Sequence, residues 1–569
     1  MKICLKLPPI LPLAMLASLL MACQVTLAAL TATFEQKLSD AAGVAYDYFG
    51  NTVAISADGS TAIVGVALDD AGSLENAGRV FVFTRSGSVW SQQAILTATG
   101  ALAGDTFGTA VALSANGSTA LIGAAGVQEG RGAAYVFTRS GSTWSQQAKL
   151  TAADAAISDS LGSSVALSAD GGTAIAGAPA YQAGGVTAGA AYVFTRSGTA
   201  WSQHTKLTAT DAAAEDSFGY AVTLTSDGLR AIVGAPRDDH TATNNAGSAY
   251  AFMRSGGGWT QEAKLVDISV SGKGTFFGAV AALSADGATA LIGKQFGRST
   301  TNISSGTATI FTRTGSAWSA LVRLEPPSPV VNDWFGNSVS LSADGTRALV
   351  GSVQKDILPN DNKGVAFLFS HNGSAWALQT TLTAPDGGNV DYFGASLALT
   401  AAGDRAFVGA SNDDIGDQSD TGSAYAFTIG AAPPPGFTTW ADAAGLLGAD
   451  RDLAANPAKD GVSNLLKFAF NLTAAAADLR VLAAGSGTAG LPVIGTTGSA
   501  FRVEYLRRIG SGLIYTPFKN SALTGTWTVM TGTPLVTGID ANWERVVVQD
   551  SYDPLVTPRL FGKVQVTAP

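Results

Sequence analysis

A Phe-Gly dipeptide, or a near copy of it, recurs seven times at intervals of 54 to 59 residues, and this repeat constrains the fold more than any other feature. The copies are Phe49-Gly50, Phe107-Gly108, Leu161-Gly162, Phe218-Gly219, Phe277-Gly278, Phe335-Gly336 and Phe393-Gly394. A period of this size, filled with short alternating segments, is typical of radial or solenoid repeats in which each unit packs against its neighbours. The motif therefore predicts the architecture and leaves the chemistry open.

Each unit carries the signals of four short strands. In residues 107–151, alternating or apolar segments lie at 110–114, 120–123, 134–138 and 144–150, and Asn116-Gly117 separates the first two. Asn-Gly and Asp-Gly favour two-residue hairpins because a type I′ turn needs positive φ at both central positions. The same place holds Asp58-Gly59, Asp170-Gly171, Asp227-Gly228, Asp286-Gly287, Asp344-Gly345 and, in unit seven, Ala402-Gly403. The chain is therefore expected to be all-β, with repeated four-stranded antiparallel sheets.

The two ends of the repeat region predict how the repeats close. Units one to six each end in a tryptophan strand, but unit seven stops at Phe427, before a proline-rich segment. The missing strand matches residues 34–38, FEQKL, which resemble the QQAKL at 146–150. We therefore expect a seven-bladed β-propeller over residues 30–431, closed by the N-terminal strand so that few sheet edges remain.

The first 29 residues predict export. Lys2 and Lys6 precede an apolar stretch at 11–22, which is too short to span a bilayer and is typical of a signal peptide. Two cleavage sites compete: a lipobox at residues 20–23, which would place a lipid on Cys23, and an ordinary site after Ala28 or Ala29. Cys4 is the other cysteine, so we expect a mature fold without disulfides. We expect an extracellular or envelope location, with membrane contact through a lipid on Cys23 only.

The repeats resemble the FG-GAP family, which forms the propeller of integrin α-subunits. Besides the Phe-Gly pairs, the sequence keeps Gly-Ala-Pro at residues 177–179 and 234–236. The resemblance implies a seven-bladed propeller that serves as a binding surface, often with calcium in the first hairpin of a blade. Here those hairpins offer one carboxylate each or none, whereas Ca²⁺ takes six to eight oxygen ligands. We therefore expect no cofactor, with calcium left as an alternative, and read the Asp-Gly pairs as turns.

Two acidic sets lie on one face of the expected propeller. An aspartate stands two residues before the motif Phe or Leu in six units, where it either pins a tight turn or contributes to an acidic rim that meets a partner. The loops between second and third strands vary in length, and variable loops on a regular scaffold are where recognition usually resides. Their candidate binding residues are Asp69, Asp70, Asp238, Asp239, His240, Asp356, Asp413 and Asp414.

The period ends at a proline-rich linker, residues 432–436. Helical spacing follows at 440–447 and 462–470, and alternating segments follow near 501–506, 513–518, 527–530, 543–549 and 559–566. Residues 437–569 are therefore expected to form a small helical plus β module. They resemble a C-terminal module of secreted bacterial proteins, on the strength of residues 460–466 (DGVSNLL) and 505–508 (YLRR). The resemblance implies a reduced calcium loop at Asp450, Asp452 and Asp460.

Composition and motifs favour a binding protein over an enzyme. The three histidines lie in different units, and no nucleophile elbow or phosphate-binding loop appears. The formal net charge of −9 argues against nucleic acid as a partner. The repeated tryptophans are expected to pack between blades rather than to stack on sugars. We expect an exported, monomeric, non-enzymatic scaffold for binding or adhesion to a protein or glycan; the alternatives are a hydrolase or lyase on a propeller, and a structural envelope component.

Overall fold

The computed structural model describes residues 30–183, 185–239, 245–267, 274–299, 303–357, 362–431, 492–497, 500–508, 513–520, 528–539, 543–551 and 561–567. Residues 30–430 form one compact unit, and the described residues that follow belong to a second. The predicted leader, the lipid site at Cys23, the linker and both helical stretches lie outside the described residues. The described residues contain no helix that is long and apolar enough to cross a membrane.

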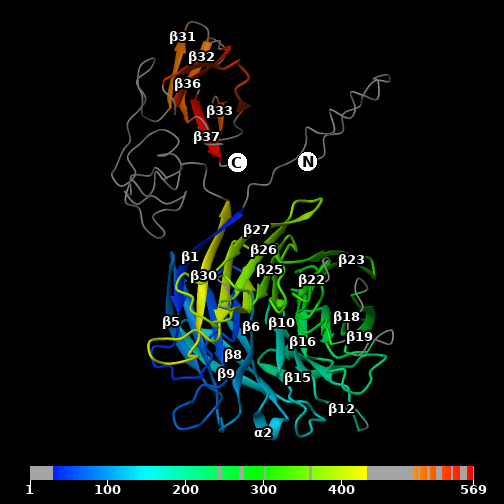
Figure 1. Ribbon diagram of the computed structural model, residues 1–569. Coiled ribbons are helices and arrows are strands. Elements are labelled where there is room, and N and C mark those ends of the chain that lie inside the picture. Colours follow the sequence, from blue (N-terminus) through cyan, green and yellow to red (C-terminus); the bar gives the residue numbers. More distant parts are fainter. Residues whose placement is uncertain are drawn as a thin grey trace, which may run out of the picture. The chain divides into compact units, whose positions relative to one another are not determined.

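The first unit is built of four-stranded antiparallel sheets, one for each sequence repeat, and of these the described residues contain seven (Figure 1). Sheets 1 to 3 are β2 (Thr52–Ile55), β3 (Thr61–Val66), β4 (Arg79–Ser86), β5 (Val89–Leu96); β6 (Phe107–Leu113), β7 (Thr119–Ala124), β8 (Ala133–Ser140), β9 (Thr143–Leu150); and β10 (Ser164–Leu167), β11 (Thr173–Ala178), β14 (Ala190–Ser197), β15 (Ala200–Leu207). Sheets 4 and 5 are β16 (Ala221–Leu224), β17 (Arg230–Ala235), β18 (Ser248–Ser255), β19 (Gly258–Leu265); and β20 (Ala281–Leu283), β21 (Thr289–Lys294), β22 (Thr307–Thr314), β23 (Ala317–Leu324). Sheets 6 and 7 are β24 (Phe335–Leu341), β25 (Arg347–Ser352), β26 (Val365–His371), β27 (Trp376–Leu382); and β28 (Phe393–Leu399), β29 (Arg405–Ala410), β30 (Ser423–Ala431) with β1 (Leu30–Leu38).

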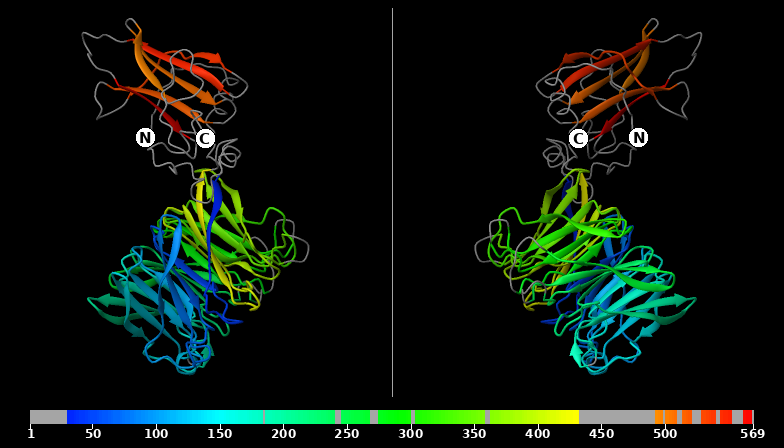
Figure 2. Two further views of the ribbon diagram at one scale, coloured as in Figure 1. Left: turned by 90° about the vertical axis from the view of Figure 1, so that its left-hand side faces the viewer. Right: turned by 90° about the vertical axis from the view of Figure 1, so that its right-hand side faces the viewer.

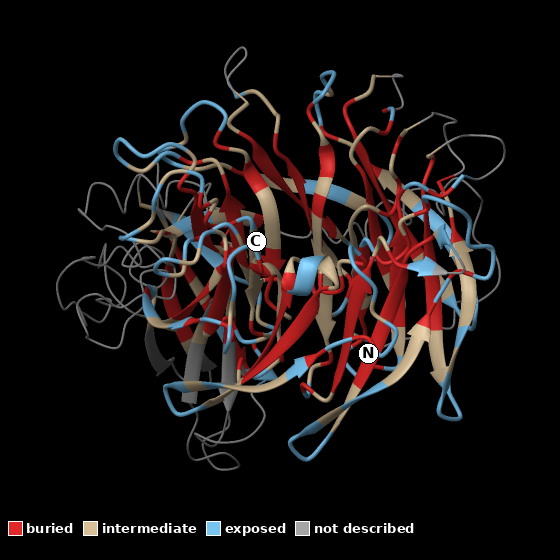
Figure 3. Ribbon diagram, turned by 90° about the horizontal axis from the view of Figure 1, so that it is seen from below, coloured by how far each residue is buried: buried red, intermediate tan, exposed pale blue. Residues whose placement is uncertain are grey.

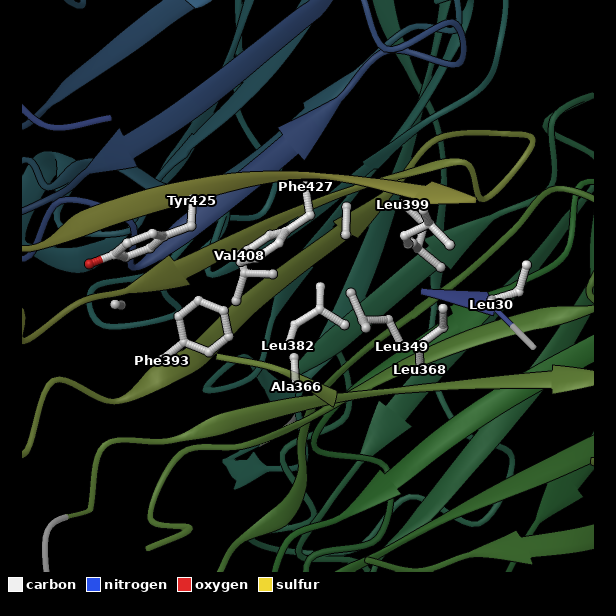
Figure 4. Packing of buried hydrophobic residues seen from close by; sticks show 13 residues of the cluster. Leu30, Leu349, Ala366, Leu368, Leu382, Phe393, Leu399, Val408, Tyr425 and Phe427 are labelled. Carbon is white, nitrogen blue, oxygen red and sulfur yellow. The ribbon is translucent and has the colours of Figure 1, made fainter. Parts of the chain in front are cut away.

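Sheet 7 combines strands from the two ends of the unit, in the order β1-β30-β29-β28. In both views of Figure 2, β1 (dark blue) runs beside β30 (yellow). The Phe34 ring lies 5.9 Å from that of Phe427, and the Thr428 hydroxyl donates to the Glu35 carboxylate. Leu30 joins the apolar cluster between sheets 6 and 7, where Leu368 and Val408 are fully buried (Figure 4). The predicted pairing of residues 34–38 with the strand around 425–428 is thus confirmed.

The chain alternates between two faces of this unit. The turn between the first and second strands of each sheet lies on what we call the hairpin face. The loop that enters each sheet, and the loop between its second and third strands, lie at the opposite end of the strands, on what we call the entry face. The entry face also carries the helical turn α2 (Val127–Gly130) and the short strands β12 (Gln182–Ala183) and β13 (Val186–Thr187). Viewed from below, buried residues run along the sheets and exposed residues gather in the turns and loops (Figure 3).

The motif Phe or Leu joins each sheet to the one before it. Its side chain is at most 1% exposed in all seven copies, because it packs on the third strand of its own sheet, as Phe107 does on Tyr135 at 5.6 Å. Its backbone N–H donates, at 2.8–3.2 Å, to a carbonyl in the preceding sheet's loop: Thr421 for Phe49, Ala77 for Phe107, Arg131 for Leu161, Ala188 for Phe218, Ala246 for Phe277, Ser305 for Phe335 and Lys363 for Phe393. The motif therefore supplies both packing and a hydrogen bond between neighbouring sheets.

The two motif glycines meet across the same contact. A Cβ added to the glycine of the second strand would lie closer than 3.0 Å to the carbonyl oxygen of the Phe-Gly glycine of the next sheet. The pairs are Gly65 with Gly108, Gly123 with Gly162, Gly177 with Gly219, Gly234 with Gly278, Gly293 with Gly336, Gly351 with Gly394 and Gly409 with Gly50. The Phe-Gly glycines also have positive φ, which side chains disfavour. Close backbone approach thus explains why glycine persists where the rest of the Gly-Ala-Pro motif varies.

The hairpin face carries a cycle of backbone hydrogen bonds between the first turns. The N–H of the residue before each Asp-Gly, or its equivalent, donates to the matching carbonyl of the next sheet at 2.8–3.1 Å. The cycle runs from Ala57 to Ala115, Ala169, Ser226, Ala285, Ala343, Ala401 and back to Ala57. Within each turn the aspartate accepts locally; Asp58 accepts from the hydroxyl of Ser56 and from the N–H of Ser60.

The C-terminal unit contains two antiparallel sheets in its described residues. One has the order β31-β32-β36-β35 and the other the order β34-β33-β37. Their bounds are β31 (Val493–Thr497), β32 (Ala500–Arg508), β33 (Ile514–Asn520), β34 (Thr528–Val529), β35 (Leu535–Gly538), β36 (Trp543–Ser551) and β37 (Phe561–Thr567). The five alternating segments predicted from the sequence each overlap one of these strands, β32, β33, β34, β36 and β37. A buried ion pair joins Glu504 of β32 to Arg545 of β36 at 3.0 Å.

Candidate functional site on the entry face

The aspartates that precede the motif Phe or Leu are buried parts of the entry loops. All six are 2–5% exposed. Each accepts a hydrogen bond from the backbone N–H three residues before it: Val44 to Asp47, Leu102 to Asp105, Ala156 to Asp159, Ala213 to Asp216, Val330 to Asp333 and Gly388 to Asp391. In the unit without this aspartate, the Thr275 hydroxyl donates to the Ala246 carbonyl. The turn-forming interpretation of these residues is therefore confirmed.

Burial shifts the acidity of three of these carboxyls. The pKa of Asp47, of Asp216 and of Asp391 is raised to about 6, chiefly because burial penalises the charged form. A loop carboxylate adds to each shift: Asp69 beside Asp47, Asp238 beside Asp216, and Asp413 beside Asp391. The entry face therefore holds three carboxyls whose pKa is about 6.

Three of the predicted binding residues are buried and paired, which corrects their assignment as ligand contacts. Asp69, Asp238 and Asp413 are 0–3% exposed. Asp69 pairs with Arg79, Asp238 lies 2.7 Å from the Lys264 ammonium, and Asp413 lies 2.7 Å from that of Lys37. The prediction follows from their position in loops of variable length, and the sequence of these loops does not indicate that they are buried. Their role in the structure is to hold the loop onto its own sheet.

Four other predicted residues shape the loops from the surface. Asp70, Asp239 and Asp414 are exposed and Asp356 is partly exposed. Each accepts, at 2.6–2.9 Å, a hydrogen bond from the backbone N–H six residues later, at Asn76, Asn245, Asp420 and Asn362 respectively. His240 lies outside the described residues. These four carboxylates remain candidates for ligand contact, and they also give four loops of varied sequence a common conformation.

A recurring Tyr-Lys-Asp network on the entry side escaped prediction from the sequence. In sheet 4 the Tyr250 hydroxyl donates to Asp238 at 3.2 Å, while Lys264 pairs with Asp211 and Asp238 and lies over the Tyr250 ring. Sheets 3 and 7 repeat it with Tyr192, Lys206 and Asp154, and with Tyr425, Lys37, Asp386 and Asp413. The available signal was the lysine at the penultimate position of each of these outer strands, which in sheets 3 and 4 lies opposite a third-strand tyrosine.

The repeated tryptophans of the fourth strands pack between sheets, as predicted. Trp90 is 3% exposed and its ring lies 5.4 Å from that of Phe407 in sheet 7. The indole N–H of Trp144 donates to Gln93 at 3.1 Å, and that of Trp201 donates to Gln147 at 2.9 Å. Both bonds link the fourth strand of one sheet to the fourth strand of the sheet before it. These tryptophans therefore serve to join neighbouring sheets.

A pocket opens on the entry face where sheets 7 and 1 meet. Its volume is about 260 Å³, and it is lined by Asp47, Tyr48, Asn51, Ala67, Leu68, Ser411 and Asn412. Asp47 to Asn51 come from the loop entering sheet 1, and Ser411 and Asn412 come from the loop after β29. The Asn412 amide donates to Asp420 at 2.9 Å, which fixes its orientation. The lining thus combines a carboxyl, two amides, a hydroxyl and an aromatic ring.

The described part of the chain contains no group of three or more His, Cys, Asp or Glu residues placed to hold a metal ion. Asp450, Asp452 and Asp460, the candidate metal residues of the C-terminal module, lie outside that part. In the first hairpins, where calcium was the alternative, the aspartate carboxylate accepts hydrogen bonds from its own turn, as Asp58 does from Ser56 and Ser60.

The family assignment rests on both the repeats and the sheets. A family model described as FG-GAP repeat matches residues 32–83, 90–137, 144–194, 201–252, 318–369 and 376–427, which is more than half of the chain. This chain belongs to the FG-GAP repeat family. The matches leave out residues 253–317, where the first three strands of sheet 5 form despite the divergent repeat sequence. No curated protein matches the sequence.

Solved structures similar to this FG-GAP protein are distant. Hydrazine synthase of Kuenenia stuttgartiensis has a TM-score of 0.43 and 11% identity, over 65% of this chain and 94% of that one. The WD40 repeats of RRP9 have a TM-score of 0.43 and 10% sequence identity, over 71% of this chain and 98% of that one. The periplasmic gluconolactonase of Pseudomonas aeruginosa has a TM-score of 0.40 and 15% sequence identity, over 60% of this chain and 86% of that one. At these scores, none of the three informs the function of this chain.

Proposed function

We propose that residues 30–430 form one seven-bladed propeller ring closed by β1. Two cycles support this ring. The hydrogen bonds between first turns return from Ala401 to Ala57, and the entry-loop bonds return from Phe49 to Thr421. Both cycles pass through sheet 7, which pairs β1 with β30. The chain also runs directly from β1, in sheet 7, to β2, in sheet 1, which is a third observation that supports closure.

We infer that this ring is an exported, non-enzymatic scaffold that binds a protein or glycan ligand on its entry face. The observation that carries this proposal is the pocket between sheets 7 and 1, because small-molecule sites are concave and place a few polar groups among apolar ones. The hairpin face offers nearly identical turns whose polar groups bond to one another. The entry face offers loops of different length around the pocket.

The test is an array of glycans and proteins probed with the purified mature chain, with and without Ca²⁺. Asn51→Ala should weaken any binding that the array finds, because Asn51 is exposed and its amide lines the pocket. Leu229→Ala, at an exposed first-hairpin turn on the opposite face, is the matched control and should bind normally. If only Leu229→Ala loses binding, the binding site lies on the hairpin face and the proposal is wrong. If the protein chemically converts the bound ligand, the proposal of a non-enzymatic scaffold is wrong and the hydrolase or lyase alternative is favoured.

Export is tested separately, by mass spectrometry of the protein recovered from its native host. An N-terminus at Ala29 or Leu30, or a lipid-modified Cys23, supports it. A chain that keeps Met1 contradicts it.

A further inference from the structure

One residue of each entry loop adopts the same unusual backbone conformation. It lies between the buried Asp (or Thr275) and the motif Phe or Leu, and its φ is positive in every copy, from 54° to 62°. In three consecutive sheets it is small and hydroxylic: Thr106, Ser160 and Ser217. In the four consecutive sheets 5, 6, 7 and 1 it is aromatic: Phe276, Trp334, Tyr392 and Tyr48. We call these four residues the aromatic arc.

The core does not account for the aromatic arc. The residues on either side of each member are buried, as Asp333 and Phe335 are around Trp334, while the arc residues themselves are partly exposed. Positive φ costs a bulky side chain about 1–3 kcal/mol, and such strain tends to persist at functional sites. Sheets 2 to 4 form the same loop with Ser or Thr. The loop therefore does not require an aromatic side chain.

Neighbouring rings extend the arc. Phe296, in the loop between β21 and β22, lies 5.6 Å from the Phe276 ring and 5.5 Å from the Trp334 ring, edge to face with both. Tyr46 is 57% exposed and its ring lies 6.4 Å from that of Tyr48. One half of the entry face thus presents a run of rings, and the other half presents hydroxyls at the equivalent places.

Polar groups beside the arc indicate what it would bind. The pocket next to Tyr48 places the Asp47 carboxyl and the side chains of Asn51 and Asn412 near the ring. A sugar ring has an apolar C–H face, which stacks on aromatic rings, and an edge of hydroxyls, which bond to carboxylates and amides. The net charge of −9, with exposed Asp414 close by, disfavours anionic polymers, nucleic acids included.

We propose that the aromatic arc is a stacking platform for a neutral polysaccharide, and that the pocket beside Tyr48 takes the hydroxyls of one of its sugar units. This inference rests on the proposed entry-face function and names its ligand class. Rings in successive sheets suit an extended chain that contacts several blades at once.

The experiment is affinity gel electrophoresis of the mature chain in gels containing dextran, laminarin, galactomannan or xyloglucan, with alginate as an anionic comparison. Trp334→Gly and Tyr392→Gly should each weaken binding to the retarding polymer roughly tenfold, as loss of one stacking ring does elsewhere. Ser160→Gly and Ser217→Gly are the matched controls, because they make the same backbone change at the same loop position. Glycine accepts positive φ, which offsets the packing that the aromatic variants lose, so all four variants should melt close to the parent.

Several results would overturn the inference. They are no retardation by any of the four neutral polymers, retardation by alginate alone, or equal effects of the aromatic and the serine substitutions. If the array finds a protein ligand sensitive to Asn51→Ala while no neutral polymer binds, the carbohydrate platform fails and entry-face binding stands. If neither assay finds a ligand, both fail.

Discussion

At the scale of single residues, glycine and aspartate do more than form turns. The paired glycines let the backbones of neighbouring sheets touch, and the buried aspartates hold the entry loops by one backbone N–H each. The sequence predicted the Asp-Gly turns and the strands correctly, because both depend on local chemistry. It did not predict burial of Asp238, because the partners Tyr250 and Lys264 come from later strands and only the fold brings them together.

Gly234→Ala should destabilise the protein, since the new Cβ would meet the carbonyl oxygen of Gly278 in the next sheet, a backbone atom that cannot move freely. Overpacking of this kind costs about 1–3 kcal/mol. We expect the melting temperature to fall by several degrees in differential scanning calorimetry. Gly258→Ala is the control, because its Cβ would find only the Ser255 oxygen, at 4.0 Å. Equal melting of the two variants would disprove the close contact.

Asp216→Asn should change how stability depends on pH. Because the pKa of Asp216 is raised to about 6 from 3.8, the native chain holds a proton that the unfolded chain releases between about pH 4 and pH 6. This group therefore favours folding at the acid end of that window, and its contribution is lost as pH rises through 6. The neutral variant escapes that loss, so it should exceed the parent in unfolding free energy by up to about 3 kcal/mol at pH 7.5 and match it near pH 4.

The measurement is a series of melts from pH 4 to pH 8. Asp227→Asn serves as control, because this exposed residue occupies the turn position that Asn116 fills in unit two. Parallel profiles for parent and Asp216→Asn would count against a raised pKa at this site.

At the scale of elements, β1 matters most, because it lies far from β30 in sequence and beside it in the sheet. It could be recognised from sequence because FEQKL copies an outer-strand pattern and unit seven lacks one. The arc residues could not be recognised in this way, since neither a serine nor a tryptophan indicates positive φ. The helices expected at 440–447 and 462–470 lie outside the described residues and stay predictions.

Deletion of residues 30–40 should leave the edge of β30 unpaired and remove Leu30 and Leu38 from their apolar clusters. Unpaired sheet edges associate with one another, so we expect soluble oligomers or aggregates in size-exclusion chromatography with light scattering. A synthetic peptide of residues 30–40, added during refolding, should restore the monomer. A truncated chain that stays monomeric with an unchanged melting temperature would rule out closure by β1.

At the scale of the whole molecule, stability should come from contacts between sheets rather than from metal. The first-hairpin aspartates bond within their own turns, as Asp58 and Asp170 do. EDTA should therefore shift the melting temperature of the mature chain by no more than about 1–2 °C, since a bound ion would stabilise the native state by mass action. A large fall that added Ca²⁺ reverses would reveal a site outside the described residues or within the acidic loops.

The cycle of hydrogen bonds on the hairpin face has a consequence for how such a protein can evolve. Each first turn donates to the next and accepts from the one before, so the seven turns have neither a first nor a last member. Duplicating one repeat would force every crossing angle between sheets to change at once, and losing one would do the same. Repeat number is therefore fixed collectively, while each entry loop can change alone. New binding specificities are expected to arise by loop substitution, not by a change in the number of repeats.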